Sequence, residues 1–117
     1  EKVGLFRTEK QLREAVETLR EIREDFKDVF IAGKCLRYSQ EIVNIMEFDS
    51  MLDLADVIAL GAIHRRETRG SHYRLDFPQR DDKEWLRHTL VTLEDGKPKV
   101  THGPVNLGKY APAARTY

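Results

Sequence analysis

The first proline of this chain is Pro78, and the proline-free stretch before it repeats apolar residues at the spacing of an α-helix. Thr8 and Gln11 have the spacing of a capping box, which marks a helix N-terminus. Apolar residues then recur every three or four positions as far as Phe26, while charged residues fill most other positions and indicate a solvated face. This pattern predicts a helix over about Thr8–Asp28.

A second, broader apolar stripe runs from residue 42 to residue 63. Ser39 is a candidate N-cap, and Gly70 is a candidate C-terminal stop because glycine adopts the left-handed conformation that ends many helices. Gly61 lies inside the stripe, where glycine costs about 1 kcal/mol relative to alanine unless a neighbour packs closely on it. We expect a second helix over about Ser39–Arg66.

Composition limits the chain to one small domain. It has 117 residues, 34% of them charged, with 20 basic and 20 acidic side chains. A net charge of zero disfavours a nucleic-acid binder and a polybasic membrane anchor, and the longest apolar runs are too short to insert into a bilayer.

Because the chain starts at Glu1 without a methionine or signal-peptide pattern, we expect a piece of a longer protein, with residues 1–7 ending a preceding helix.

The last third of the chain changes character. An irregular, charged loop is expected from Ser71, followed by β-favouring residues over 87–93. Asp95-Gly96 is a strong hairpin signal, and a turn there pairs Glu94 with Lys97. An extended tail follows from Gly103. The chain thus divides into a helical part, 1–70, and a loop, hairpin and tail, 71–117.

No recognised motif for catalysis, metal or cofactor binding is present. The four histidines lack the paired spacing of zinc ligands. Cys35 is the single cysteine, with no partner motif, and is interpreted as a structural thiol. There is no glycine-rich dinucleotide or phosphate loop. We therefore assign no catalytic, cofactor-binding or metal-binding residue.

The densest charge lies between Arg65 and Arg87, with seven basic and five acidic residues. Arginines suit bidentate contacts with carboxylates or phosphates, so this segment is either an anion site or an ion-paired helix end and loop docked on another domain. A dianion pocket should have a clear positive excess. The weak excess here favours docking.

This segment strongly resembles the C-terminal domain of the flavoprotein subunit of succinate dehydrogenase and fumarate reductase. That family has Arg-Lys-Glu-Ser-Arg-Gly-Ala-His-Tyr-Arg, then Asp-Tyr/Phe-Pro, then Arg-Asp-Asp-x-x-Trp-Leu-x-His-Thr-Leu. The matching blocks here, with Thr68 and Ser71 as small departures, are Arg66-Glu67-Thr68-Arg69-Gly70-Ser71-His72-Tyr73-Arg74, Asp76-Phe77-Pro78 and Arg80-Asp81-Asp82-Lys83-Glu84-Trp85-Leu86-Arg87-His88-Thr89-Leu90. The ends, Gly4-Leu5-Phe6-Arg7-Thr8 and Pro112-Ala113-Ala114-Arg115-Thr116-Tyr117, resemble the family too.

The resemblance implies a mainly α fold: a truncated three-helix bundle with two long antiparallel helices, then an irregular loop and a small C-terminal β-hairpin. It implies a parent oxidoreductase that interconverts succinate and fumarate with covalently bound FAD and passes electrons to an iron–sulfur subunit. The parent is expected in the cytoplasm, on the inner face of the plasma membrane through partner subunits, or at the mitochondrial inner membrane in a eukaryote. The family's flavin and substrate residues lie upstream, so this chain alone is expected to be inactive.

We expect this chain to dock on the FAD domain of its parent. The candidate docking residues are Glu67, Arg69, His72, Arg74, Asp76, Trp85 and His88. Because most of the bundle's first helix is missing, the chain is also expected to expose an apolar face and to self-associate. Two alternatives remain: the C-terminal domain of an L-aspartate oxidase, which shares the first block, and a free-standing protein-interaction module.

Overall fold

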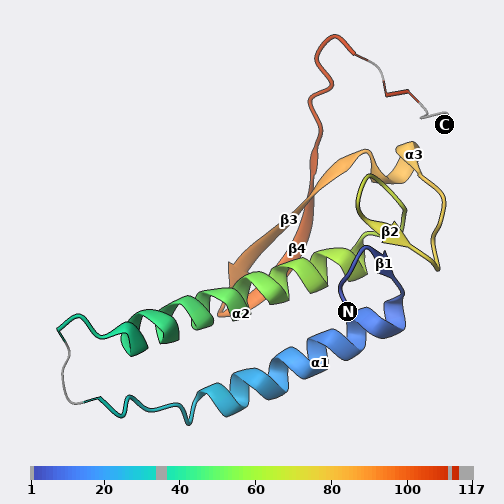
Figure 1. Cartoon of the computed structure of the whole chain (residues 1–117). Helices are drawn as coiled ribbons and strands as arrows, with labels where there is room; N and C mark the ends of the chain where they lie inside the picture. The colour runs from blue at the N-terminus through green and yellow to red at the C-terminus, as the bar shows by residue number, and fades with distance from the viewer. Residues whose placement is uncertain (1, 34–36, 111, 114–117) are drawn as a thin grey trace.

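Two long helices and a β-hairpin make up most of the structure (Figure 1). The computed structural model describes residues 2–33, 37–110 and 112–113; Cys35 and the last four residues of the chain fall outside this part. The elements are β1 (Phe6–Arg7), α1 (Glu9–Phe26), α2 (Gln40–His64), β2 (Tyr73–Arg74), α3 (Asp82–Trp85), β3 (Arg87–Glu94) and β4 (Lys97–Pro104).

Helices α1 and α2 run antiparallel, side by side, as predicted (Figure 1). Their facing stripes form the small core, whose buried apolar residues are Leu12, Ala15, Val16, Leu52, Ala59 and Ala62. Polar contacts add to this packing near the C-terminal end of α1, where Arg23 donates hydrogen bonds to Asp53 and Asp56 of α2 at 2.9 and 3.1 Å. The predicted mainly α fold with a C-terminal hairpin is confirmed.

The N-terminal caps follow the prediction more closely than the C-terminal ends do. Thr8 and Gln11 form the full capping box of α1. Ser39 occupies the N-cap position of α2, but its side chain makes no capping hydrogen bond. Helix α1 ends at Phe26, two residues before the predicted Asp28.

The predicted stop of α2 at Gly70 is wrong. The helix ends at His64, because Arg65 is extended and the terminal carbonyls of Ala62 and Ile63 accept hydrogen bonds from Arg74. Gly70 does have a positive φ of 59°, but it lies in the tight turn between Arg69 and His72, whose backbones bond each other in both directions.

The hairpin turns at Asp95-Gly96, as predicted. Both turn residues have positive φ, 50° and 73°, the conformation that two-residue hairpin turns of this kind require. Glu94 pairs with Lys97 and Val91 pairs with Val100, so the predicted register is confirmed. Strand β4 continues to Pro104, slightly beyond the predicted start of the tail.

The expectation that residues 1–7 end a preceding helix is wrong. Phe6 and Arg7 form strand β1, which pairs in parallel with Tyr73 and Arg74 of β2. This pairing places the residues just before α1 beside the loop that follows α2. A long-range contact of this kind overrides local propensity.

One face of α2 is uncovered. Val43, Met46, Met51 and Leu54 are exposed and line one open groove on this face. Val57 and Ile58 are exposed as well, whereas the exposed Phe48 packs against the ring of Phe26 in α1. The expectation of an uncovered apolar stripe is therefore confirmed for the residues described here. No helix in the described part of the chain is long and apolar enough to cross a membrane.

Candidate functional site

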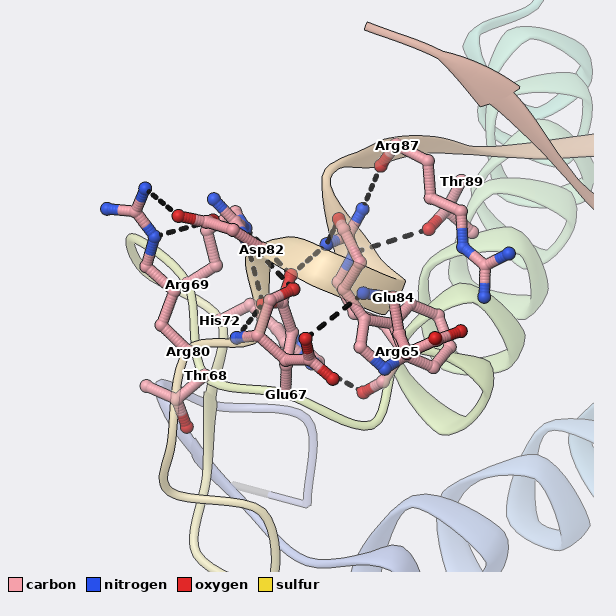
Figure 2. Close-up of polar contacts among 12 residues, drawn as sticks. Arg65, Glu67, Thr68, Arg69, His72, Arg80, Asp82, Glu84, Arg87 and Thr89 are labelled. Carbon is pink, nitrogen blue, oxygen red and sulfur yellow. Dashed lines mark hydrogen bonds and ion pairs between the residues drawn. The ribbon is translucent and has the colours of Figure 1, made fainter. Parts of the chain in front are cut away.

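The loop between α2 and β3 folds around the carboxylate of Glu67, which has no exposed surface (Figure 2). This side chain accepts hydrogen bonds from Arg65, from Arg69 at 2.7 and 3.0 Å, and from the backbone N–H of Asp81 at 3.0 Å. Two guanidinium groups and an amide thus surround one buried carboxylate. Buried charges require this degree of pairing, because an unpaired one is strongly destabilising.

Arg69 also extends the network to the surface. Its Nη2 donates to the carboxylate of Asp82 at 2.6 Å, and Asp82 accepts two further bonds from Arg80 at 2.8 and 2.6 Å. Hydrogen bonds to Glu67 raise the pKa of Arg69, and hydrogen bonds from Arg80 and Arg69 lower the pKa of Asp82 to about 2. These groups remain ionised at neutral pH.

A second buried charge, Arg74, joins the ends of the two long helices. Its guanidinium has no exposed surface, donates to the carbonyl of Ala62 at 2.7 Å, and forms a bidentate pair with Asp76 at 2.7 and 2.8 Å. Asp76 in turn accepts from the backbone N–H of Glu9, in the first turn of α1, at 2.9 Å. The cation thus faces the negative end of α2 and the carboxylate faces the positive end of α1, the favourable sign for both helix dipoles.

The hydroxyl of Thr68 holds the two sides of the loop together. It accepts from the backbone N–H of Arg74 at 2.9 Å and lies 3.0 Å from the carbonyl of Phe77, to which it donates. A serine hydroxyl can form the same two bonds, so Thr68 keeps the chemistry of the resembling motif despite the substitution.

His72 links the loop to β1. Arginine can only donate, so the 2.9 Å contact between Arg7 Nη1 and His72 Nδ1 requires an unprotonated Nδ1. The other ring nitrogen, Nε2, then donates to the carbonyl of Arg65 at 3.1 Å. Burial lowers the pKa of His72, and three nearby arginines lower it further, against a raising effect of the bond to Arg65. His72 is thus neutral in its folded setting.

Trp85 and His88 lie at the edge of this network. The guanidinium of Arg65 lies 5.7 Å from the centre of the Trp85 ring, and that of Arg87 lies 4.7 Å from it. His88 is exposed on β3, where it pairs with Gly103. Five of the predicted docking residues, Glu67, Arg69, His72, Arg74 and Asp76, therefore come together in the loop, with Trp85 adjacent and His88 apart.

Five members of the network are absent from the predicted docking residues: Arg7, Arg65, Thr68, Arg80 and Asp82. Arg7 reaches His72 only through the β1–β2 pairing, for which the sequence carries no local signal. Asp82 could have been chosen from the sequence, because it belongs to the third block of residues that match the family. No group of three or more potential metal ligands is present in the described ranges.

Comparisons with known proteins place this chain in a defined class, the C-terminal domains of flavoprotein subunits. All 117 residues match the protein family described as the fumarate reductase flavoprotein C-terminal region. The chain belongs to this family.

Curated relatives agree with this assignment. The fumarate reductase flavoprotein subunit of Haemophilus influenzae is 35% identical over 115 residues, which cover 97% of this chain and 19% of that protein. The succinate dehydrogenase flavoprotein subunit of Rickettsia bellii is 40% identical over 105 residues, which cover 89% of this chain and 18% of that protein. The chain thus spans about a fifth of the length of these relatives.

Solved structures are similar as well. A mutant of the E. coli quinol fumarate reductase subunit FrdA matches with a TM-score of 0.90 and 31% identity, covering 95% of this chain and 20% of that one. Mycobacterium smegmatis Sdh1 in complex with UQ1 matches with a TM-score of 0.80 at 21% identity, covering 88% of this chain and 18% of that one, which supports the fold alone.

Proposed function

We propose that this chain is the C-terminal helical domain of a succinate dehydrogenase or fumarate reductase flavoprotein subunit and that it docks on the FAD domain of the same parent. The parent would interconvert succinate and fumarate and pass electrons to an iron–sulfur subunit. It would be held peripherally at the inner face of the plasma membrane, or of the mitochondrial inner membrane, by partner subunits.

The observation that carries this proposal is the internal pairing of the arginine-rich loop. Arg65, Arg69, Arg74 and Arg80 all bond carboxylates of this chain, so none of these four offers a free guanidinium to a dicarboxylate or to the phosphates of FAD. These four arginines are therefore not available to a flavin, and this pairing favours structural support over chemistry for the loop. We infer that the chain alone binds neither FAD nor substrate.

The buried and exposed members of the loop would have different parts in docking. Glu67 and Arg74 have no exposed surface, so we propose that they act by fixing the shape of the loop. Arg69, His72 and Asp76 are partly accessible, as is Trp85, and His88 is exposed. These side chains would contact the FAD domain directly.

Calorimetric titration of the chain with succinate, fumarate and FAD tests the absence of a ligand site. We expect no binding at ligand concentrations up to about 1 mM, which corresponds to a binding free energy weaker than about −4 kcal/mol. A dissociation constant below this value for any of the three would contradict the proposal, because it would require a ligand site within these residues.

A further inference from the structure

Arg87 differs from the paired arginines of the preceding loop. Its carbonyl accepts a bond from Arg65, but its side chain forms no hydrogen bond or ion pair within the part of the chain that the structure describes. Its Nε is buried without a hydrogen-bond partner. Figure 2 shows its guanidinium pointing away from the Glu67 network, with no dashed contact. A buried donor without an acceptor is rare in native proteins and calls for a partner.

Packing holds this guanidinium in place. It lies 4.7 Å from the centre of the Trp85 ring, a distance at which a cation is attracted to the face of an indole. Trp85 is itself fixed by an edge contact with His102, 5.4 Å between ring centres. The Arg87 guanidinium is therefore held by packing against Trp85, so its side chain would lose little conformational entropy when a partner binds there.

A cleft of about 410 Å³ opens beside Arg87. Every charged or titratable side chain that lines it is basic, and these are Arg65, Arg69, Arg87 and His88. Arg65 and Arg69 already bond Glu67, so Arg87 supplies the unmatched charge. His102 is exposed on β4 with its ring beside Trp85, and its pKa is lowered by partial desolvation and then by the positive charges of Arg87 and Arg65.

We propose that this cleft receives a single aspartate or glutamate carboxylate from the FAD-bearing part of the parent chain, with Arg87 as its bidentate partner. The proposal rests on the docking function proposed above. A carboxylate matches the planar fork of an arginine, and four-fifths of the relatives' length lies outside this chain to supply it. A small dianion would need a second free guanidinium, and the other two arginines of the cleft, Arg65 and Arg69, already bond Glu67.

The test uses the whole parent subunit with its flavin, and hydrogen exchange of residues 86–89 is compared between that subunit and this chain alone. We expect exchange in the parent to be at least about tenfold slower, since a charged hydrogen bond closes the cleft. Arg87→Gln should abolish most of this protection, and Arg87→Lys should retain part of it. The matched control is Arg20→Gln. Arg20 is an exposed arginine of α1 that pairs with Glu17, and its substitution should leave the protection unchanged.

The outcomes separate this inference from the docking function. If the chain is protected in the parent and Arg87→Gln leaves this protection unchanged, the role of Arg87 is overturned while the docking proposal stands. If no part of the chain is protected in the parent, both proposals fail. Thermal unfolding of each variant as an isolated chain controls for misfolding. Binding of inorganic phosphate to the isolated chain below about 1 mM would identify a small-anion site and overturn the carboxylate assignment.

Discussion

Glu67 and Arg74 are charged residues with no exposed surface, in a segment whose composition resembles a solvated loop. Each is neutralised by side chains two residues away in the sequence: Arg65 and Arg69 for the first, Asp76 for the second. Such pairs add little net stability compared with an apolar core, but removing one partner leaves an uncompensated buried charge. Single substitutions should therefore have large effects here.

Glu67→Gln should lower the free energy of unfolding by about 2–4 kcal/mol, because Arg65 and Arg69 lose their shared counter-ion. Urea unfolding followed by circular dichroism measures the change. Glu84→Gln is the matched control, since Glu84 is exposed on α3; it should alter stability by less than about 0.5 kcal/mol. Equal effects of the two substitutions would contradict the structural role of Glu67.

His72 should make stability depend on pH just below neutrality. Its pKa is lowered by burial in the folded state, whereas the unfolded value is about 6.5. Below pH 6.5 the unfolded chain therefore binds more protons than the folded chain. The contribution of His72 to the free energy of unfolding is constant above that pH and falls as the pH drops toward the folded pKa. The pKa of His102 is lowered as well, so its protonation contributes to the same decline in stability. Asp76, with a pKa of about 2, loses its contribution only below about pH 4.

Unfolding measured between pH 7.5 and pH 4.5 checks this expectation. His72→Gln should flatten the decline, and His72→Gln combined with His102→Gln should nearly remove it. A stability that rises as the pH falls from 7 to 5, or a decline that the double substitution leaves unchanged, would show that protonation of these two side chains is not coupled to folding.

At the scale of elements, Gly61 is a weak point in α2. A Cβ placed there would lie 3.7 Å from the Thr89 methyl group of β3, which is ordinary van der Waals contact. The hairpin therefore does not require glycine. Gly61→Ala should raise the free energy of unfolding by about 0.5–1 kcal/mol by removing backbone entropy from the unfolded chain. A lower melting temperature for this variant would mean that the hairpin packs more tightly on α2 than the structure has it.

The uncovered face of α2 should cause the isolated chain to self-associate. Val43, Met46, Met51 and Leu54 line an open apolar groove on this face, and monomeric proteins rarely expose large contiguous apolar patches. Sedimentation velocity at rising concentration should reveal dimers or larger species, and Leu54→Glu should shift them to monomer. Glu47→Gln, in the same groove, is the control. Strictly monomeric behaviour of the unchanged chain at high concentration would contradict this prediction.

Local patterns predicted the elements that local physics determines. The capping box at Thr8, the helical periodicity and the Asp95-Gly96 turn act over a few residues, and each appears as expected. The predicted end of α2 and the helix predicted to end within residues 1–7 were wrong. Both regions are determined by contacts with Tyr73 and Arg74, which are distant in sequence. The burial of Glu67 could not be predicted either: Arg65 and Arg69 are close in sequence, but the loop closes over this carboxylate through the backbone N–H of Asp81, which is distant in sequence.

At the scale of the whole molecule, the loop ties the domain together at one end. Arg74 and Asp76 join the last turn of α2 to the first turn of α1, and β1 pairs with β2 beside them. The uncovered face of α2 and the cleft beside Arg87 are surfaces that the described residues leave unfilled. This arrangement suits a domain that is completed by the rest of a longer protein.

The most direct test titrates this chain into the separately produced FAD-bearing remainder of a parent subunit and measures the heat of binding. Bound-flavin absorbance verifies that the remainder is folded. Our account predicts a one-to-one complex with a dissociation constant in the micromolar range or tighter, which corresponds to about −8 kcal/mol or more. Absence of binding to a folded, flavin-loaded remainder would contradict the central claim that this chain is a docking domain.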